Sequence, residues 1–158
     1  AGGVCQAAPR WDAGEAAAGG GIAMLKGNCI HPGIAAAAAL CGHGDQILIA
    51  DGNYPLSTRS GEAEKIFLGL SRNLPTVQEV LRALLTLVEV EGAQVMATDE
   101  GCMPEAALTY APLLKDVEMT MLSREAFYEA SSGKKVRLAI STGDIRPYAN
   151  ILLTVGTA

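Results

Sequence analysis

Apolar residues along this chain follow two spacings, one typical of buried strands and one typical of amphipathic helices. The run 46–50 is apolar after its first residue and does not alternate with polar residues, which indicates a strand buried on both faces. Other short runs rich in β-branched and apolar residues lie between turn-forming residues. The predicted strands lie at 46–50, 66–70 (the weakest), 94–98, 117–122, 136–141 and 151–155.

The clearest helix is predicted to begin after Thr76. Thr76 and Glu79 have the spacing of a capping box, in which each side chain accepts a hydrogen bond from the other residue's backbone N–H. Apolar residues then recur at helical spacing over 77–88, which gives the helix one broad apolar face.

Three further helices are predicted. The alanine-rich segment 34–40 has high helix propensity, and Gly42 is expected to end this helix as its left-handed C′ residue. Segment 104–108 has a proline at its first turn, and segment 124–130 follows Ser123, a good N-cap residue.

Strands that alternate with helices predict an α/β fold, with a mostly parallel central sheet and helices on both faces. In such folds ligands bind outside the carboxyl ends of the strands. Asp51 directly follows the strand 46–50, and Arg124 stands just after the strand 117–122. A cation in the first turn of a helix is less favourable than an anion. Arg124 is therefore a candidate functional residue, with a solvated surface arginine as the equal alternative.

The length of 158 residues is sufficient for one domain with a substantial core. Residues 24–158 carry every predicted element and are expected to form that domain. Residues 1–23 are rich in glycine and alanine and have no helical or strand period. We expect them to be a disordered N-terminal extension, or a remnant of a targeting or expression sequence.

Charge and composition narrow the classes of function. A net charge of −5 argues against binding to nucleic acid and to an anionic membrane surface. No apolar run approaches the roughly 18–20 residues that a transmembrane helix needs. The four cysteines are scattered, so free thiols in a reducing cytoplasm are expected.

His43 and Asp51 flank the strand 46–50 and carry the first candidate chemistry. Glycines at 42, 44 and 52 permit sharp turns, so we expect both side chains to face one pocket as a general acid–base pair. The structural alternatives are a histidine that ties down its turn and an aspartate that braces its loop.

Tyr148 and Asn150 are a second candidate pair, because a phenol and an amide are suited to recognising hydroxyl groups. Their alternative role is that of turn and strand-entry residues. Metal binding is disfavoured: the Cys-x-His pairs at 29–31 and 41–43 are too closely spaced for structural zinc. Gly42-His43-Gly44 precedes its strand, whereas a dinucleotide-binding loop follows one.

Taken together, these residues resemble the D-ribose pyranase / L-fucose mutarotase family. The likeness runs from Met24 to Gly156, and the order and spacing of its pieces are more specific than any one of them. The pieces are Gly-His-Gly-Asp at 42–45, Ile-Ala-Asp at 49–51, Asn-Tyr-Pro at 53–55, Arg-Glu-Ala-Phe-Tyr-Glu at 124–129 and Pro-Tyr-Ala-Asn-Ile-Leu-Leu at 147–153.

The resemblance implies a role for each candidate residue. His43 takes the place of the family's catalytic histidine, and the sugar-contacting positions are Asp51, Arg124, Tyr148 and Asn150, with Tyr148 also able to take part in proton transfer. It further implies an enzyme without cofactor or metal, and a homodecamer whose pockets lie at subunit boundaries and bind a free monosaccharide.

The expected substrate is L-fucose. Arg124 and the segment Phe-Tyr-Glu at 127–129 resemble fucose-type members, whereas Pro-Tyr-Ala-Asn at 147–150 resembles ribose-type members. Tyr54 or Tyr128 is expected to lie against the apolar face of the sugar. The alternatives are a D-ribose pyranase and a non-catalytic monosaccharide-binding module.

Overall fold

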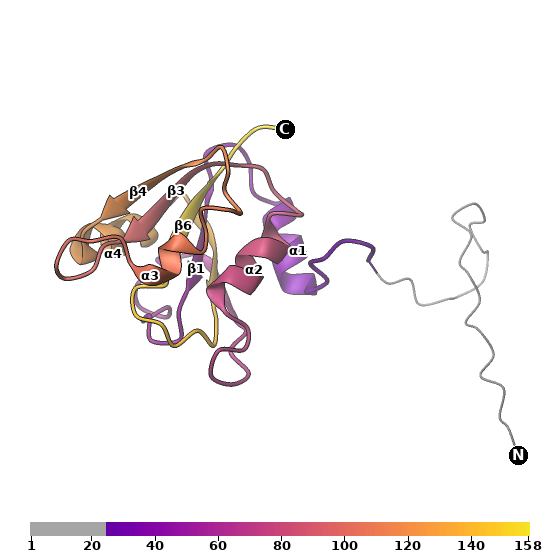
Figure 1. Cartoon of the computed structure of the whole chain (residues 1–158). Helices are drawn as coiled ribbons and strands as arrows, with labels where there is room; N and C mark the ends of the chain where they lie inside the picture. Colours follow the sequence, from indigo (N-terminus) through magenta and orange to yellow (C-terminus); the bar gives the residue numbers. More distant parts are fainter. Residues whose placement is uncertain (1–24) are drawn as a thin grey trace, which may run out of the picture.

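A six-stranded sheet with helices on both of its faces organises the computed structural model, which describes residues 25–158 (Figure 1). The expected N-terminal extension 1–23 lies outside the described residues. The strands are β1 (Gln46–Ala50), β2 (Glu64–Phe67), β3 (Val90–Met96), β4 (Glu118–Leu122), β5 (Val136–Ser141) and β6 (Ile151–Val155). The helices are α1 (Pro32–Ala39), α2 (Val77–Leu84), α3 (Glu105–Leu108) and α4 (Arg124–Ser131).

The strand order across the sheet is β2-β5-β1-β6-β3-β4. The pairs β2–β5, β1–β5 and β3–β4 are parallel, as the alternation of strands and helices predicts. The last strand, β6, is inserted between β1 and β3 and runs antiparallel to both. The start of β6 therefore lies at the same edge as the carboxyl ends of β1 and β3.

Strand β1 shows why the sheet is covered on both faces. Successive side chains of a strand point to opposite faces. Ile47 and Ile49 pack into a core that includes residues of α1, α2 and α3, whereas Leu48 and Ala50 pack into a second core around Phe127 of α4. All four β1 residues are fully buried, which confirms the two-sided burial and the fold class predicted from the sequence.

Helix α2 begins as predicted. The Thr76 hydroxyl accepts a hydrogen bond from the Glu79 backbone N–H at 3.2 Å, and the Glu79 carboxylate accepts one from the Thr76 backbone N–H at 2.8 Å. The helix ends at Leu84, earlier than the apolar pattern indicates. Val88 lies beyond the helix but still packs against the core, which explains why the pattern continues.

Helix α1 corrects one prediction. Its C-cap is Leu40 in a right-handed conformation, so Gly42 is not the residue that ends the helix. The Gly42 N–H instead donates to the carboxylate of Asp45 within the following turn, at 2.8 Å. At the start of α1, the Nδ1 atom of His31 accepts a hydrogen bond from the Ile34 N–H at 3.2 Å, a capping role that the sequence analysis missed.

Three strands also differ from their predicted bounds, β4 by only one residue at its start. Strand β3 begins at Val90, before the predicted start, and β2 is displaced toward the N-terminus of the predicted run. In both β2 and β3, polar or glycine residues occupy paired positions at the start of the strand. A search for apolar runs does not detect such positions. Among residues 25–158, no helix is both long enough and apolar enough to cross a membrane.

We expect Thr76→Ala to lower the free energy of unfolding by about 1 kcal/mol, because the Glu79 N–H loses its capping acceptor. Urea denaturation followed by circular dichroism measures the change. Thr86→Ala is the matched control, since the exposed Thr86 hydroxyl contacts only a carbonyl near the end of the same helix. Equal losses in the two variants would contradict the capping role.

Candidate functional site

A pocket of about 240 Å³ lies at the edge of the sheet where β1 and β3 end and β6 begins. This volume is just below the range of about 300–1,000 Å³ that holds drug-sized ligands, and it suits a smaller molecule. Six residues proposed from the sequence line it together. The lining consists of Asp51, Asn53, Tyr54, Met96, Arg124, Tyr128, Pro147, Tyr148 and Asn150.

Asp51 and Asn150 form the floor of the pocket and are almost fully buried. The Asn150 side-chain oxygen accepts a hydrogen bond from the Asp51 backbone N–H at 2.8 Å. The Asp51 carboxylate accepts from the backbone N–H groups of Asn53, at 2.9 Å, and Ala149, at 3.3 Å. Burial raises the pKa of Asp51, while these hydrogen bonds oppose the rise. A polar ligand that donates to this carboxylate would compensate part of its desolvation.

Tyr148 reaches the pocket from an unusual backbone conformation. Its φ is 57°, in the left-handed region that a bulky side chain rarely adopts and that costs about 1 kcal/mol or more. The next residue, Ala149, is anchored on both sides: its N–H donates to Asp51, and its carbonyl accepts from the buried Tyr110 hydroxyl at 2.6 Å. These bonds hold the chain in the conformation that directs Tyr148 toward the pocket.

Arg124 connects the first turn of α4 to Tyr148. Its guanidinium donates to the Tyr148 hydroxyl and to the Asp99 carboxylate, each at 3.1 Å, and lies 5.6 Å from the centre of the Tyr148 ring. The hydrogen bond with Tyr148, followed by the charge of Asp99, raises the pKa of Arg124. The side chain is about half exposed, so it borders the pocket while remaining accessible to solvent.

Aromatic rings form one wall of the pocket. Tyr54 and Tyr128 meet edge to face with ring centres 5.5 Å apart. The Tyr54 hydroxyl donates to the Arg59 carbonyl at 2.7 Å, and burial raises the pKa of Tyr54 to about 12. Tyr54 is therefore neutral, and its hydroxyl is already bonded within its own loop. Tyr128 is more exposed and is the aromatic side chain available to a ligand.

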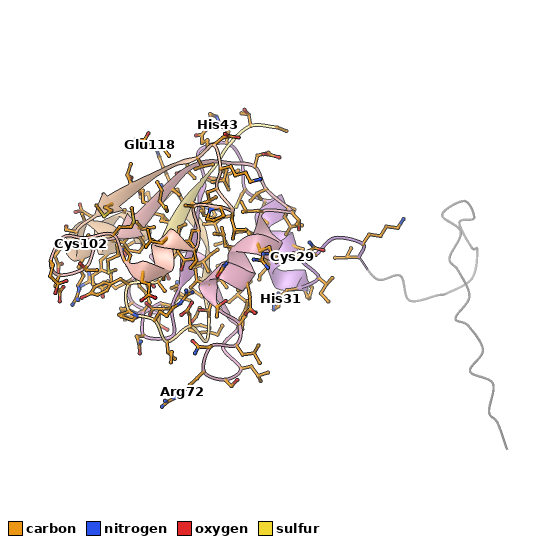
Figure 2. All side chains as sticks on the ribbon, viewed as in Figure 1. Cys29, His31, His43, Arg72, Cys102 and Glu118 are labelled. Atoms are coloured by element: carbon orange, nitrogen blue, oxygen red, sulfur yellow. The ribbon has the colours of Figure 1, made fainter. Side chains whose placement is uncertain are left out.

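His43 does not lie in this pocket. Its Nε2 atom contacts the Glu91 carboxylate, at 3.0 and 3.1 Å, on the opposite edge of the sheet, close to the C-terminal end of the chain (Figure 2). Strand β1 separates His43 from Asp51 and spans about 16 Å. The expectation that glycine turns bring both side chains to one pocket within a chain is therefore wrong. The glycines turn the chain, but the buried strand between them is extended and keeps the two side chains apart.

An ion pair between the buried Asp144 and the partly exposed Arg146 holds the segment that leads to Tyr148. The Asp144 carboxylate accepts from the Arg146 side chain at 2.6 and 3.0 Å, and from the Val77 N–H at the start of α2 at 3.0 Å. Burial acts to raise the pKa of Asp144, but the hydrogen bonds from Arg146 and Val77 lower it below its ordinary value. The Asp144 carboxylate thus links the segment 144–148 to the start of α2.

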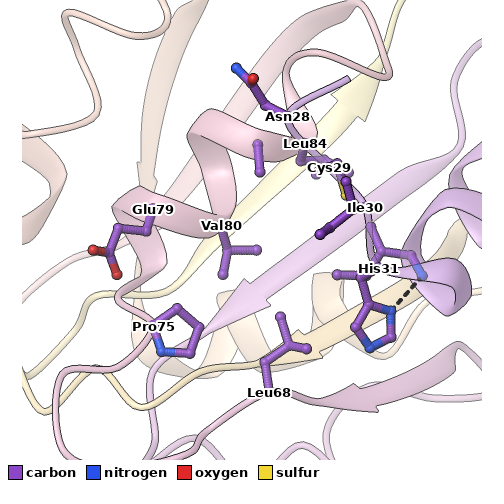
Figure 3. Close-up of a pocket in the computed structure, with 11 residues that line it drawn as sticks. Asn28, Cys29, Ile30, His31, Leu68, Pro75, Glu79, Val80 and Leu84 are labelled. Atoms are coloured by element: carbon purple, nitrogen blue, oxygen red, sulfur yellow. Dashed lines mark hydrogen bonds between the residues drawn. The ribbon is translucent and has the colours of Figure 1, made fainter. Parts of the chain in front are cut away.

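A second hollow of about 220 Å³ lies between α1 and α2 and is lined mainly by apolar side chains (Figure 3). Two of its polar residues already have structural roles, because His31 caps α1 and Glu79 belongs to the capping box of α2. Within residues 25–158, no three His, Cys, Asp or Glu side chains converge to hold a metal ion. Cys29, Cys41 and Cys102 are free thiols.

The sequence analysis missed Asp99 and Met96. Met96 ends β3, and Asp99 follows it by three residues, so the rule that ligands bind at carboxyl ends of strands points to both. The predicted strand 94–98 ran past the observed end, which concealed that position. Asn53 was noted only as part of a motif, and its exposed side chain lines the pocket.

Comparison with known proteins identifies the family. The model of the RbsD / FucU transport protein family matches residues 24–158. The chain belongs to this family. Among curated relatives, the D-ribose pyranases of Paracidovorax citrulli and Halalkalibacterium halodurans are 34% and 32% identical to it, over 141 and 133 residues. Each alignment covers 84% of this chain and 98% of the relative.

Solved structures of the RbsD/FucU family share the fold. RbsD of Bacillus subtilis, complexed with D-ribose, has a TM-score of 0.75 and 30% identity, covering 85% of this chain and 99% of that one. The fucose mutarotase of Streptococcus pneumoniae, complexed with L-fucose, has a TM-score of 0.67 and 29% identity, covering 82% of this chain and 94% of that one.

We expect Asp144→Asn to lower the free energy of unfolding by about 2 kcal/mol at pH 7, because the charged hydrogen bonds are lost. The folded pKa of Asp144 lies below its unfolded value, so its stabilisation is complete above the unfolded pKa of about 3.9. It disappears as the pH falls through the folded pKa. Denaturation at a series of pH values should show the two proteins converging in acid.

The control for this experiment is Asp116→Asn, which removes the same charge from an exposed side chain. It should change stability little at any pH. A difference between wild type and Asp144→Asn that stays constant from pH 7 to strong acid would contradict the role of the carboxylate.

Proposed function

We propose that this protein is a cofactor-independent isomerase that interconverts the ring forms of a free monosaccharide. The observation that carries the proposal is the convergence of a buried carboxylate, an amide, a phenol and a guanidinium on one small pocket. These groups are suited to holding several hydroxyls at once. The relatives support it, since curated ones are named D-ribose pyranase and solved ones hold D-ribose or L-fucose.

The reaction requires only proton transfer. The anomeric hydroxyl loses its proton and becomes the carbonyl oxygen, the bond from C1 to the ring oxygen breaks, and the ring oxygen gains a proton. Rotation about the bond next to the carbonyl and closure on its other face then give the other anomer, while closure by a different hydroxyl changes the ring size. Positioned acid–base catalysis typically contributes about 10²–10⁴-fold, so no metal or nucleotide is needed.

Five of the pocket residues have a place in this mechanism. Asp51 and Asn150 would bind hydroxyls at the floor, and Arg124 would donate to hydroxyl oxygens at the rim. Tyr148 would hold a hydroxyl and take part in proton transfer, while Tyr128 would lie against the apolar face of the sugar.

His43 is proposed as the acid that protonates the ring oxygen. Because it lies at the sheet edge opposite the pocket of its own chain, it would serve the pocket of a neighbouring copy. Its exposed position on the surface supports this arrangement. The proposed assembly is a homodecamer in which each site combines the pocket of one subunit with the histidine of another.

We expect His43→Ala to slow catalysed anomer exchange by about 10²-fold or more without unfolding the protein. Saturation-transfer NMR on ribose and fucose measures exchange, and circular dichroism checks the fold. Saturable sugar binding without faster exchange in the wild type would instead indicate a non-catalytic binding module. A fully active His43→Ala protein would remove His43 from the mechanism.

Mixed assemblies test whether the site is shared. His43→Ala and Asn150→Ala are each expected to be nearly inactive alone. When the two are unfolded together and reassembled at equal amounts, random pairing should restore about a quarter of the wild-type sites. Mixing without reassembly is the control, and no recovery after reassembly would place both residues in the same subunit's site.

The substrate is proposed as D-ribose or L-fucose. The names of the curated relatives favour D-ribose, which departs from the preference for L-fucose drawn from the sequence. Arg124, which lines the pocket and bonds to Tyr148, is the feature that favours L-fucose.

We expect Arg124→His to reduce kcat/KM for L-fucose more than for D-ribose, by about tenfold in their ratio, since a long cationic donor is replaced by a shorter one. Parallel exchange measurements on the two sugars provide the ratio. Arg82→His, on the exposed side of α2, is the matched control. An unchanged ratio would show that Arg124 does not discriminate between the sugars.

A further inference from the structure

We infer that Glu91 is a positioning residue for the reaction: it orients the His43 imidazole through Nε2 and leaves Nδ1 to exchange protons with the sugar. This inference rests on the proposed function. It assigns a role to a residue that lies outside the pocket.

The contact between the two side chains is specific in its geometry. Both Glu91 carboxylate oxygens lie within hydrogen-bond distance of the same ring nitrogen, Nε2, at 3.1 and 3.0 Å. A carboxylate can only accept a hydrogen bond, so Nε2 must carry the proton. In the neutral imidazole the other nitrogen, Nδ1, is then unprotonated, and it can donate a proton to the ring oxygen after it has taken one up.

A backbone irregularity places Glu91 at this point. In the ladder between β3 and β6, Val90 pairs with Val155 and Gly92 pairs with Thr154, which leaves Glu91 without a partner on β6. Such β-bulges redirect a side chain and are frequent next to active sites. Without the extra residue, the alternation of the strand would direct position 91 differently relative to the His43 turn.

The His43 turn is tied to the same end of β6. The Gly44 N–H donates to the Val155 carbonyl at 2.9 Å, and the Val155 N–H donates to the Asp45 carbonyl at 2.8 Å. The following residue, Gly156, donates its N–H to the Glu89 carbonyl at 2.9 Å. Backbone bonds therefore fix the two segments that carry His43 and Glu91 relative to each other.

Exposure of the pair agrees with action on a sugar bound by another copy. The side chains of His43 and Glu91 are 60% and 46% exposed. An imidazole held by one carboxylate at the surface can present its free nitrogen to an approaching pocket. When the imidazole takes up a proton, the adjacent carboxylate stabilises the cation, as a carboxylate does for a catalytic histidine generally.

The test replaces Glu91 by glutamine, which keeps the size of the side chain and removes its charge. We expect kcat for anomer exchange to fall about tenfold with little change in KM, because sugar binding belongs to the pocket and proton transfer to His43. Glu89→Gln is the matched control: it removes the same charge two residues away, from an exposed side chain.

A spectroscopic readout separates orientation from general stability. ¹⁵N NMR of histidine-labelled protein should show the neutral His43 ring protonated at Nε2 in the wild type and as a mixture of tautomers in Glu91→Gln. The chain has only two histidines, and His31 is an internal reference because its Nδ1 accepts from the Ile34 N–H.

Each outcome decides one point. An active wild type whose Glu91→Gln variant keeps both its kcat and its His43 tautomer would overturn the role of Glu91 and leave the proposed function standing. A wild type that binds sugar without accelerating exchange would overturn the proposed function itself, and with it any catalytic positioning by Glu91.

Discussion

The antiparallel insertion of β6 between β1 and β3 determines how the ends of β6 meet Asp51 and the turn that carries His43. Because β6 runs against its neighbours, its first residues meet the carboxyl ends of β1 and β3, and Tyr148 and Asn150 reach the pocket that Asp51 enters from β1. The end of β6 reaches the other edge, where Val155 bonds to the turn that carries His43. A parallel β6 would reverse both relations.

Inside the pocket, this arrangement is maintained at a cost in stability. Asp51 is desolvated, which raises its pKa, and Tyr148 occupies a left-handed conformation. Both are stabilised by bonds that converge on Ala149, from the Asp51 carboxylate and the Tyr110 hydroxyl. Local strain and a buried carboxylate typically persist in a fold only when the surrounding structure fixes them, and they are concentrated at functional sites.

Much of the fold could be predicted from local patterns. Strands β1, β5 and β6 have the predicted bounds, and the caps of α2 and α4 involve Thr76 and Ser123 as expected. These features depend on neighbours in the sequence. The direction of β6, the early start of β3 and the end of α1 depend on pairing and packing with distant segments. Hydrophobic periodicity and residue propensity therefore do not predict them.

The candidate site was likewise predictable where it depends on local sequence, and not where it depends on distant segments. The carboxyl-end rule and residue chemistry singled out Asp51 and Arg124, and the resemblance grouped them with Tyr148 and Asn150, which the pocket brings together. His43 was misplaced within the chain because proximity in sequence was taken as proximity in space. Seven residues separate it from Asp51, and five of them form a strand that is paired on both sides.

Glu91, the hydrogen-bond partner of His43, shows more generally what short-range sequence patterns cannot predict. Glu91 lies 48 residues from His43 along the chain, and the two meet only because a bulge in β3 and the end of β6 bring them to one edge. An unpaired glutamate in a strand has no signature in composition or period. The pocket and the imidazole are thus each built by long-range pairing, at opposite edges of one sheet. Within one chain the paired strand β1 keeps the two apart, because a strand of five residues spans about 16 Å.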